Sequence, residues 1–411
     1  MADERRIIGP VAGVFITIAT VIDAGVFATL GPATDRAGTG ILLSVVLAGL
    51  IALASGTSGA QLGSAFQVSG GAFIWTRKVG LPTVSFAAGL CFLGKEIVGQ
   101  SVNALVLIGY SRALLPAMPL HVVAFAVIVV MTALNYFGVE PTAKVMVILS
   151  IALCVLLALF IVLVAPHVSA SRMRPLSGPG VLGLLGGAGT FFFTFAGFQR
   201  IAVIASEVKR PKRTIPISVF VGFAITSLLF LGTAAVTLGA IGPLRMGGPE
   251  SVPLLSAAAL TLGKWGPRLV VAAAAVASLS TLAGGILGAS RVAQIMGTEH
   301  ELPEKLGQAK GRTPKAAVLW FGLGTAVVTL LFDLRPLLNI ANVLTLLWYG
   351  ATNFAAVRLR DKEHFAPRWI SWAGLIGCLV LLFVLPWRAV LVAAIALGAL
   401  VTYRYFRNPS V

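Results

Sequence analysis

Four ionisable residues lie inside long apolar runs of the chain: Asp23, Lys95, Glu96 and Arg200. An ionisable side chain at the middle of a membrane helix costs roughly 2.5 to 3.5 kcal/mol on insertion scales, so each needs a partner or a role. One interpretation is a buried ion network in which Asp23 pairs with Arg200 or Lys95. The other is functional: Asp23 binds a substrate ammonium or carries a coupling proton, and Arg200 faces the substrate.

Two glycine-containing segments interrupt apolar runs beside these residues, at 23–27 (Asp-Ala-Gly-Val-Phe) and 193–199 (Phe-Thr-Phe-Ala-Gly-Phe-Gln). An unwound turn inside a membrane is tolerated only where it is buried in protein or lines a watery cavity. Its half-helix N-terminus offers N–H groups to a carboxylate, and its free carbonyls suit an ammonium. The alternative is that these glycines only pack helices together, as small residues do in membranes.

The elements that must position these residues are transmembrane helices. Of the 411 residues 58% are hydrophobic and only 11% charged, with a mean hydropathy of +0.96, whereas soluble domains are roughly 25% charged. Many apolar runs reach the ~20 residues that a helix needs to cross a bilayer. The expected spans are approximately 10–31, 39–61, 81–110, 119–137, 143–165, 180–204, 214–241, 268–295, 315–332, 335–357, 369–385 and 387–404.

About twelve spans of this length leave no room for a soluble domain, so we expect one all-α membrane domain over residues 1–411. The formal charge is +17, but the basic residues lie in short loops and not along one stripe, which argues against nucleic acid. With both termini inside, the cytoplasmic segments contain Arg77, Lys78, Lys144, Lys209, Arg210, Lys212, Arg213, Arg291, Lys305, Lys310, Arg312, Lys315, Arg358, Arg360, Lys362, Arg368, Arg404 and Arg407. The opposite loops contain fewer: Arg36, Arg112, Arg172, Arg174, Arg245, Lys264, Arg268, Arg335 and Arg388. Cytoplasmic termini in a prokaryotic inner (plasma) membrane are therefore predicted.

Enzyme and metal sites are not indicated. The four histidines and three cysteines are scattered, so we expect no metal cluster, disulfide or cofactor. The segment 89–96 resembles a phosphate loop, but Glu96 replaces the Ser or Thr that binds magnesium. No Gly-x-Ser-x-Gly or His-Glu-x-x-His motif occurs in the chain.

Several motifs resemble the amino acid-polyamine-organocation (APC) transporter superfamily, from the first span to about the tenth. The most specific is 197–202 (Gly-Phe-Gln-Arg-Ile-Ala) followed by 206–211 (Ser-Glu-Val-Lys-Arg-Pro) and 214–216 (Thr-Ile-Pro), which looks like the sixth helix and the loop after it. Similar matches occur at 61–63 with 69–73, at 135–139, and at 289–291 with 302–303.

The resemblance implies a five-plus-five inverted repeat, LeuT-like, with helices one and six broken. The first repeat covers about 10–165, the second about 180–357, and two extra helices about 369–404. Residue by residue, it implies that Ala24, Gly25 and Val26 meet the substrate carboxylate, and that backbone near Phe195 and Ala196 meets the amine. It further implies gate roles for Phe193 and Glu207, and it adds Gly197 and Gln199 to the site.

The chain also departs from the family pattern. Asp23 replaces a small residue, Gln61 and Gln199 stand where acidic residues are common, and Leu153 replaces a lysine that some members use. Related folds place a sodium ion near the position of Ser278, Ser280 and Thr281, although such hydroxyls also serve helix packing. Coupling to H⁺ or Na⁺ therefore stays open.

The function that we predict is secondary active transport of an amino acid, preferably neutral, by alternating access. Phe193, Trp348 and Tyr349 are candidates to close over the substrate, although Trp348 and Tyr349 also suit an aromatic belt. Asp23 keeps cationic amino acids, amines and polyamines as alternatives, and import, export and exchange all stay open. A channel is disfavoured because no continuous polar stripe appears, and a non-transporting membrane subunit remains the alternative of another class.

Overall fold

Helices make up most of the residues that the computed structural model describes, which are 6–138, 143–174, 180–248, 252–308 and 313–407. The predicted residues Val139, Lys310 and Arg312 lie outside them. Within these ranges, seven helical stretches are long and apolar enough to cross a membrane, and six shorter apolar helices accompany them. The chain is thus a polytopic membrane protein, as its composition predicts.

Two of the predicted spans are broken into shorter helices. The first consists of α1 (Pro10–Val21) and α2 (Gly25–Ala37). The sixth consists of α8 (Val181–Phe191), the 3₁₀ turn η4 (Phe192–Phe195) and the short α9 (Arg200–Val203). Ile22 leaves the helical conformation between α1 and α2, at φ −83° and ψ 75°. The two interruptions predicted at glycine are therefore confirmed as breaks in the helices.

Each of the other predicted spans is covered by one helix, and two of these helices begin with proline, at Pro82 and Pro211, the residue that suits a first helical turn. The helices are α3 (Ile41–Phe66), α5 (Pro82–Ser111), α6 (Leu120–Tyr136), α7 (Ala143–Val164), α10 (Pro211–Met246), α12 (Trp265–Thr298), α14 (Lys315–Leu331), α15 (Leu334–Val357), α16 (Arg368–Val384) and α17 (Trp387–Arg407). The helix that begins at Pro211 departs from helical geometry at Gly242, beyond its predicted span, with φ 73° and ψ 168°. Three short helices lie outside the predicted spans: α4 (Gly71–Lys78), α11 (Pro253–Leu262) and α13 (Glu304–Gly307).

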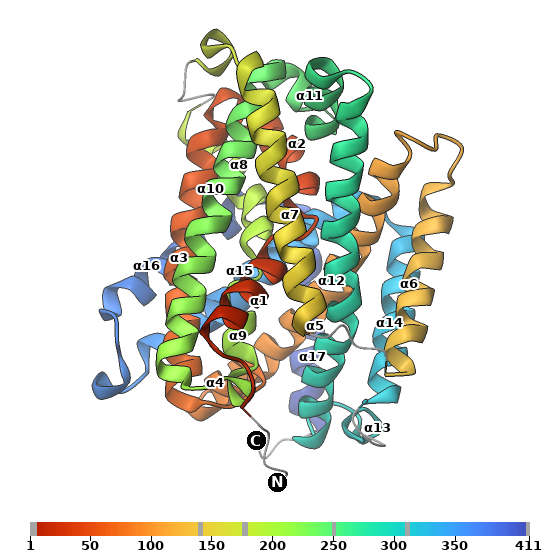
Figure 1. Ribbon diagram of the computed structural model, residues 1–411. Coiled ribbons are helices and arrows are strands. Elements are labelled where there is room, and N and C mark those ends of the chain that lie inside the picture. The colour runs from red at the N-terminus through yellow and green to blue at the C-terminus, as the bar shows by residue number, and fades with distance from the viewer. Residues whose placement is uncertain (1–5, 139–142, 175–179, 249–251, 309–312, 408–411) are drawn as a thin grey trace.

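The helices pack in two groups. In the first, α1, α2 and α3 pack with α10, and α8 packs with α2 and α3; in the second, α5 packs with α12, α14 and α6. Helix α15 contacts both α5 and α3 and so joins the groups. Helix α1 runs obliquely in Figure 1, and it contacts α10 of the first group and α12 of the second. Residues near the breaks are therefore surrounded by both groups.

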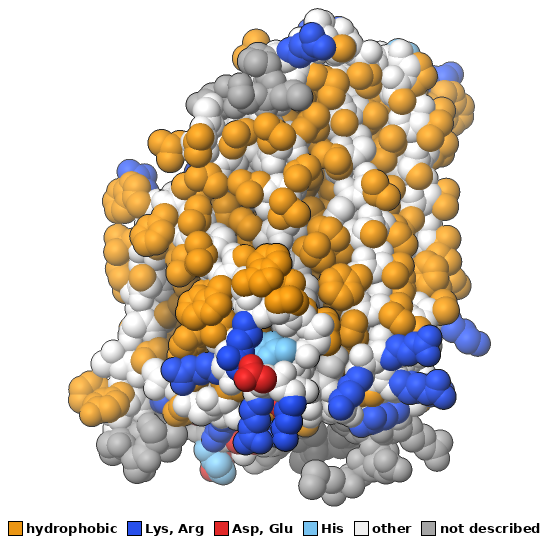
Figure 2. All heavy atoms as spheres, turned by 90° about the vertical axis from the view of Figure 1, so that its left-hand side faces the viewer, with side chains coloured by type: hydrophobic (Ala, Val, Ile, Leu, Met, Phe, Trp, Pro, Cys, Tyr) orange, Lys and Arg blue, Asp and Glu red, His pale blue; other side chains and the backbone are white. Residues whose placement is uncertain are grey.

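The surface is divided along the long axis of the molecule. Figure 2 shows a wide apolar band on one face, with Lys and Arg side chains gathered below it. We call this the lower end; α4 and α13 lie there in Figure 1, and α11 lies at the opposite, upper end. An apolar band bordered by basic residues is the pattern of a protein embedded in a bilayer.

Candidate functional site

A cavity of about 1650 Å³ extends from the two helix breaks to the lower end. Asp23 contributes from the first break, and Phe193, Ala196 and Gly197 from the second. Farther down, the cavity is bordered by Ile7, Glu207, Arg291, Gln294 and Thr298. Thr298 is exposed, so the lining connects the centre of the molecule with its lower surface.

At the first break, side chains of the protein itself bind the freed backbone donors. The Gly25 N–H donates to Asp23 Oδ1 at 2.6 Å, and the Ala24 N–H donates to Asn103 Oδ1 on α5 at 3.2 Å. Ala24, Gly25 and Val26 are buried and do not border the cavity. A Cβ on Gly25 would lie 2.8 Å from the Thr194 Cα, so glycine is required for the close approach of α2 to η4. In this arrangement Asp23, and not the N–H groups behind it, faces the cavity.

At the second break, helix α15 bonds the freed backbone. Asn342 accepts from the Phe193 N–H at 2.9 Å and donates to the Thr190 carbonyl at 3.1 Å. The Tyr349 hydroxyl donates to the Phe195 carbonyl at 3.4 Å. Asn103 and Asn342 belong to no recognised motif, and the sequence analysis did not single them out. The signal that could have identified them is a lone amide side chain in an apolar run.

Glu96 is the centre of the buried ion cluster. The Lys95 Nζ lies 2.6 Å from Glu96 Oε1, and the Arg200 Nη2 lies 3.7 Å from Glu96 Oε2. Lys95 also lies over the rings of Phe92 and Trp348, at 5.0 and 5.1 Å. Among the described residues Asp23 forms no ion pair, so the expected pairing with Arg200 or Lys95 is not formed in this structure. The physical reason is that Glu96 takes both cations, while Asp23 caps α2.

The remaining predicted site residues fall into two sets. Those that border the cavity are Asp23, Lys95, Glu96, Phe193, Ala196, Gly197, Arg200, Glu207 and Thr281. Phe195 and Gln199 do not: Phe195 lies in a cluster of aromatic rings, and Gln199 bonds the Ser55 carbonyl at 3.1 Å and the Thr352 hydroxyl at 3.1 Å. Ser278 is also outside the lining; its Oγ is buried and has no hydrogen-bond partner among the described residues, whereas Thr281 donates to the Ala277 carbonyl.

Trp348 and Tyr349 are buried, with exposed fractions of 2% and 0%, so they do not form an interfacial aromatic belt. Trp348 borders the cavity and packs on Phe92, at 5.2 Å between ring centroids. Tyr349 packs on Phe192 and supports the second break. Of the two residues, only Trp348 is placed to touch a molecule in the cavity.

The upper end is closed by polar contacts between elements far apart in the sequence. Asp35, near the end of α2, pairs with Arg335 at the start of α15 at 2.8 Å, and both also bond the Gly248 backbone. Below them the Tyr110 hydroxyl donates to the Phe27 carbonyl at 3.0 Å. At the lower end the Glu207 carboxylate lies 3.7 Å from the Arg291 guanidinium, across the cavity mouth. The site is thus sealed above and accessible below.

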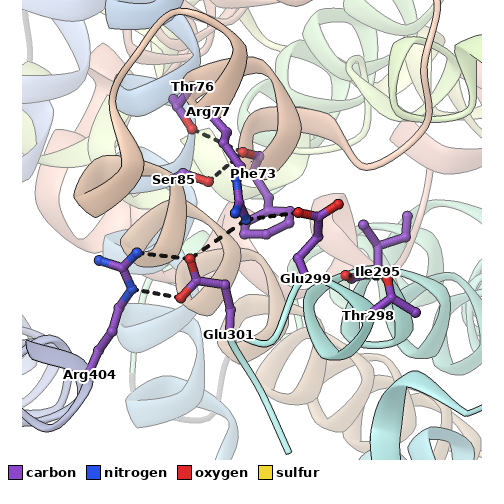
Figure 3. Close-up of polar contacts among 9 residues, drawn as sticks. All are labelled: Phe73, Thr76, Arg77, Ser85, Ile295, Thr298, Glu299, Glu301 and Arg404. Carbon is purple, nitrogen blue, oxygen red and sulfur yellow. Dashed lines mark hydrogen bonds and ion pairs between the residues drawn. The ribbon is translucent and has the colours of Figure 1, made fainter. Parts of the chain in front are cut away.

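A second ion network ties three elements together at the lower end, as Figure 3 shows. Arg404 of α17 binds both carboxylate oxygens of Glu301 at 2.6 and 2.9 Å, and Arg77 of α4 lies 3.7 Å from Glu301 and 3.1 Å from Glu299. Glu301 and Arg404 are each only 8% exposed. The network therefore fixes the end of α12, which borders the cavity, to α4 and α17.

Comparison with known proteins identifies relatives along almost the whole chain. The amino acid permease family model matches residues 12–410. An uncharacterised transporter of Mycobacterium tuberculosis is 33% identical over 96% of this chain and 89% of its own length. The branched-chain amino acid permease of Bacillus subtilis is 24% identical over 99% and 94%, and the chloroplastic cationic amino acid transporter 7 of Arabidopsis thaliana is 25% identical over 90% and 69%. These matches indicate a transporter and not an enzyme.

Proposed function

The chain belongs to the amino acid permease family, and on this premise we propose that it is a secondary transporter that carries an amino acid through the central cavity by alternating access. The observation that carries the proposal is the cavity itself, which reaches the two helix breaks from the lower end and is closed above them. A carrier needs a site that is accessible from one side at a time. The alternative of a non-transporting subunit needs no such cavity.

We place the lower end in the cytoplasm of a prokaryotic inner (plasma) membrane, with both termini on that side. Support comes from the Lys and Arg side chains gathered below the apolar band in Figure 2, because basic residues concentrate on the cytoplasmic side. In this orientation the structure is the inward-facing state. Helices α1 to α7 then make up the first of two inverted five-span repeats, α8 to α15 the second, and α16 and α17 are additional.

The substrate that we propose is a neutral amino acid. Among the described residues, the cavity is bordered by three acidic side chains, Asp23, Glu96 and Glu207, and by three basic ones, Lys95, Arg200 and Arg291. Their formal charges balance, so this described part of the lining offers no acidic excess to a polyamine. A cationic amino acid or amine is the second candidate, because Asp23 borders the cavity and pairs with no cation in the described part of the chain.

The gradient that drives transport is either of protons or of sodium. Asp23 is the candidate proton carrier, since its carboxylate borders the cavity and has no cationic partner among the described residues. Ser278 and Thr281 are candidate sodium ligands on α12. Coupling through Asp23 predicts that an imposed proton gradient accelerates uptake, whereas coupling through Ser278 and Thr281 predicts that a sodium gradient does.

The test is uptake and exchange of radiolabelled neutral amino acids, cationic amino acids and amines by proteoliposomes, with imposed proton or sodium gradients, for wild type and Asp23→Asn. We expect saturable uptake of neutral amino acids by wild type. A gradient dependence that disappears in Asp23→Asn identifies Asp23 as the coupling group. No uptake or exchange of any panel member by wild type would contradict the proposal and favour a non-transporting subunit.

A further inference from the structure

The N–H groups expected to bind a substrate carboxylate are already occupied by the protein. Gly25 donates to Asp23 and Ala24 to Asn103, and both residues are buried behind the cavity lining. A substrate carboxylate directed at the start of α2 would meet the Asp23 carboxylate first. Two like charges in direct contact across a binding interface cost several kcal/mol. The first break therefore presents an anionic surface to the substrate.

The cation best placed to bind a carboxylate in the same cavity is Arg200. Lys95 is held by Glu96 at 2.6 Å and by two aromatic rings, and its side chain is 9% exposed. Arg200 is held less tightly: its guanidinium lies 3.7 Å from the Glu96 carboxylate, a long distance for an ion pair. Its side chain is 20% exposed and borders the cavity. Its Nη1 would lie 3.0 Å from a Cβ at Gly288, so the side chain extends from α9 across to α12. Guanidinium groups bind carboxylates through two parallel hydrogen bonds, which this loose contact leaves available.

We propose that the substrate amino acid binds with its ammonium at Asp23 and its carboxylate at Arg200. This polarity is opposite to the one that the family resemblance implies, in which the carboxylate meets the start of α2. The inference rests on the proposed function, because it assigns an orientation to the transported amino acid. It makes Arg200 the residue that distinguishes an amino acid from the corresponding amine.

The orientation is tested by removing one charge at a time from ligand and protein. The probes are leucine, leucinamide, which lacks the carboxylate, and 4-methylpentanoate, which lacks the amine, each as a competitor of labelled amino acid uptake in proteoliposomes. For wild type we expect leucinamide to bind about 30-fold more weakly than leucine, because one charged contact is lost. In Arg200→Gln leucine should weaken about 30-fold, to the level of leucinamide, while leucinamide is unchanged. Arg200→Lys should recover part of the difference.

Asp23→Asn should give the complementary result. We expect it to weaken leucine and leucinamide by about 30-fold each and to leave 4-methylpentanoate unchanged. If Arg200→Gln weakens leucine and leucinamide equally, or leaves the difference between them intact, the carboxylate binds elsewhere and the inference is overturned. Wild type that transports no amino acid contradicts instead the proposed function.

A milder pair of variants avoids the loss of a buried charge. Gly288→Ala places a methyl group against the Arg200 guanidinium, whereas Gly284→Ala, one turn earlier on α12, places it in open space. Displacing the guanidinium weakens only ligands that carry a carboxylate. We expect Gly288→Ala to reduce the leucine-to-leucinamide difference about threefold, more than Gly284→Ala does. An equal effect of both variants, or an equal effect on both ligands, would count against Arg200.

Discussion

At the scale of single residues, the site depends on which carboxylate neutralises which cation. Glu96 accepts from Lys95 at 2.6 Å and lies 3.7 Å from Arg200, and Gln100 donates to it at 3.4 Å. Removing one partner of a buried ion pair leaves an uncompensated charge, which costs about 3 to 5 kcal/mol. Glu96 therefore holds the cluster together, and Asp23 remains available to the cavity.

This role predicts unequal effects of neutralising Glu96 and Lys95. Glu96→Gln leaves two cations without an acidic partner, whereas Lys95→Met leaves Glu96 beside Arg200 and Gln100. We expect Glu96→Gln to lower the apparent Tm of the purified protein by about 5 °C or more, and Lys95→Met to lower it less. Thermal unfolding in detergent measures both. A larger loss in Lys95→Met would show that the cluster is organised around the lysine.

The sequence identified the intramembrane charges but not their pairing. The sequence alone shows that four ionisable residues interrupt apolar runs, and all four border the cavity. Pairing depends on side-chain directions: Lys95 and Glu96 are neighbours in the chain, and Arg200 reaches Glu96 from another helix. The hydrogen bonds that Asn103 and Asn342 form with the backbone at the two breaks could not be predicted either, because each joins helices that are distant in sequence.

At the scale of elements, the two helix breaks fit against each other through backbone contact. A Cβ at Gly197 would overlap the Thr20 carbonyl, which belongs to the main chain of α1 and cannot turn away. The Thr20 hydroxyl also lies 3.3 Å from the Gly197 carbonyl. Gly197 is thus required for the close approach of the breaks.

Alanine at Gly197 should therefore damage the protein far more than alanine at a glycine with space around it. Gly197→Ala forces the breaks apart, at a cost of about 3 kcal/mol or more for overpacking. Gly109→Ala on α5 is the matched control, because a Cβ there meets nothing within 4 Å. The yield of monodisperse protein and its Tm measure the difference. Equal values for the two variants would mean that the breaks do not touch as described.

The lower ion network predicts a further difference along α17. Arg404→Gln leaves the buried Glu301 with only the 3.7 Å contact to Arg77, whereas Arg388→Gln changes an exposed arginine on the same helix. We expect Arg404→Gln to lower the Tm by several degrees and Arg388→Gln to leave it within about 1 °C. Should both variants unfold together, the network of Figure 3 adds nothing to stability.

Spans could be predicted at this scale, and the short connecting helices could not. Each expected span is covered by a helix or by a broken pair, because long apolar runs in a membrane have few alternatives to a helix. Helices α4 and α11 are too short to span a membrane, with 8 and 10 residues, and neither begins with a side-chain cap. Pro253 at the start of α11 is a helix-start signal, but by itself it does not predict a separate helix. The family resemblance at 69–73 covers the start of α4 but does not reveal its helical form.

At the scale of the whole molecule, the contacts above the site and the cavity below it belong to one state of the carrier. Asp35 and Arg335 are 30% and 37% exposed, and partly exposed pairs contribute about 1 kcal/mol at most. An ion pair of this strength shifts the equilibrium between the downward-open and upward-open states about fivefold, and the upward-open state stays accessible. We therefore expect Asp35→Asn to raise the fraction of upward-open protein by up to about fivefold.

Labelling at Asn339 measures that shift. This residue borders a small pocket of about 120 Å³ above the site, together with Asp35 and Arg335. A cysteine in place of Asn339 should react faster with an impermeant thiol reagent in the Asp35→Asn background, and Arg335→Gln should act in the same direction. An unchanged labelling rate in both backgrounds would mean that this pair does not hold the upper end closed.

Alternating access itself is tested most directly by labelling a single cysteine from each face of the membrane. Gln294→Cys lies in the lower part of the cavity. The native Cys91 and Cys378 are buried, and the partly exposed Cys154 is replaced by serine in each labelled variant. We predict that the reagent modifies Gln294→Cys from the lower face only, and that a transported amino acid in excess changes the rates at Gln294→Cys and Asn339→Cys in opposite directions. Modification of Gln294→Cys from both faces at once would contradict alternating access, because a residue that is reached from both sides lines an open pore and not a carrier.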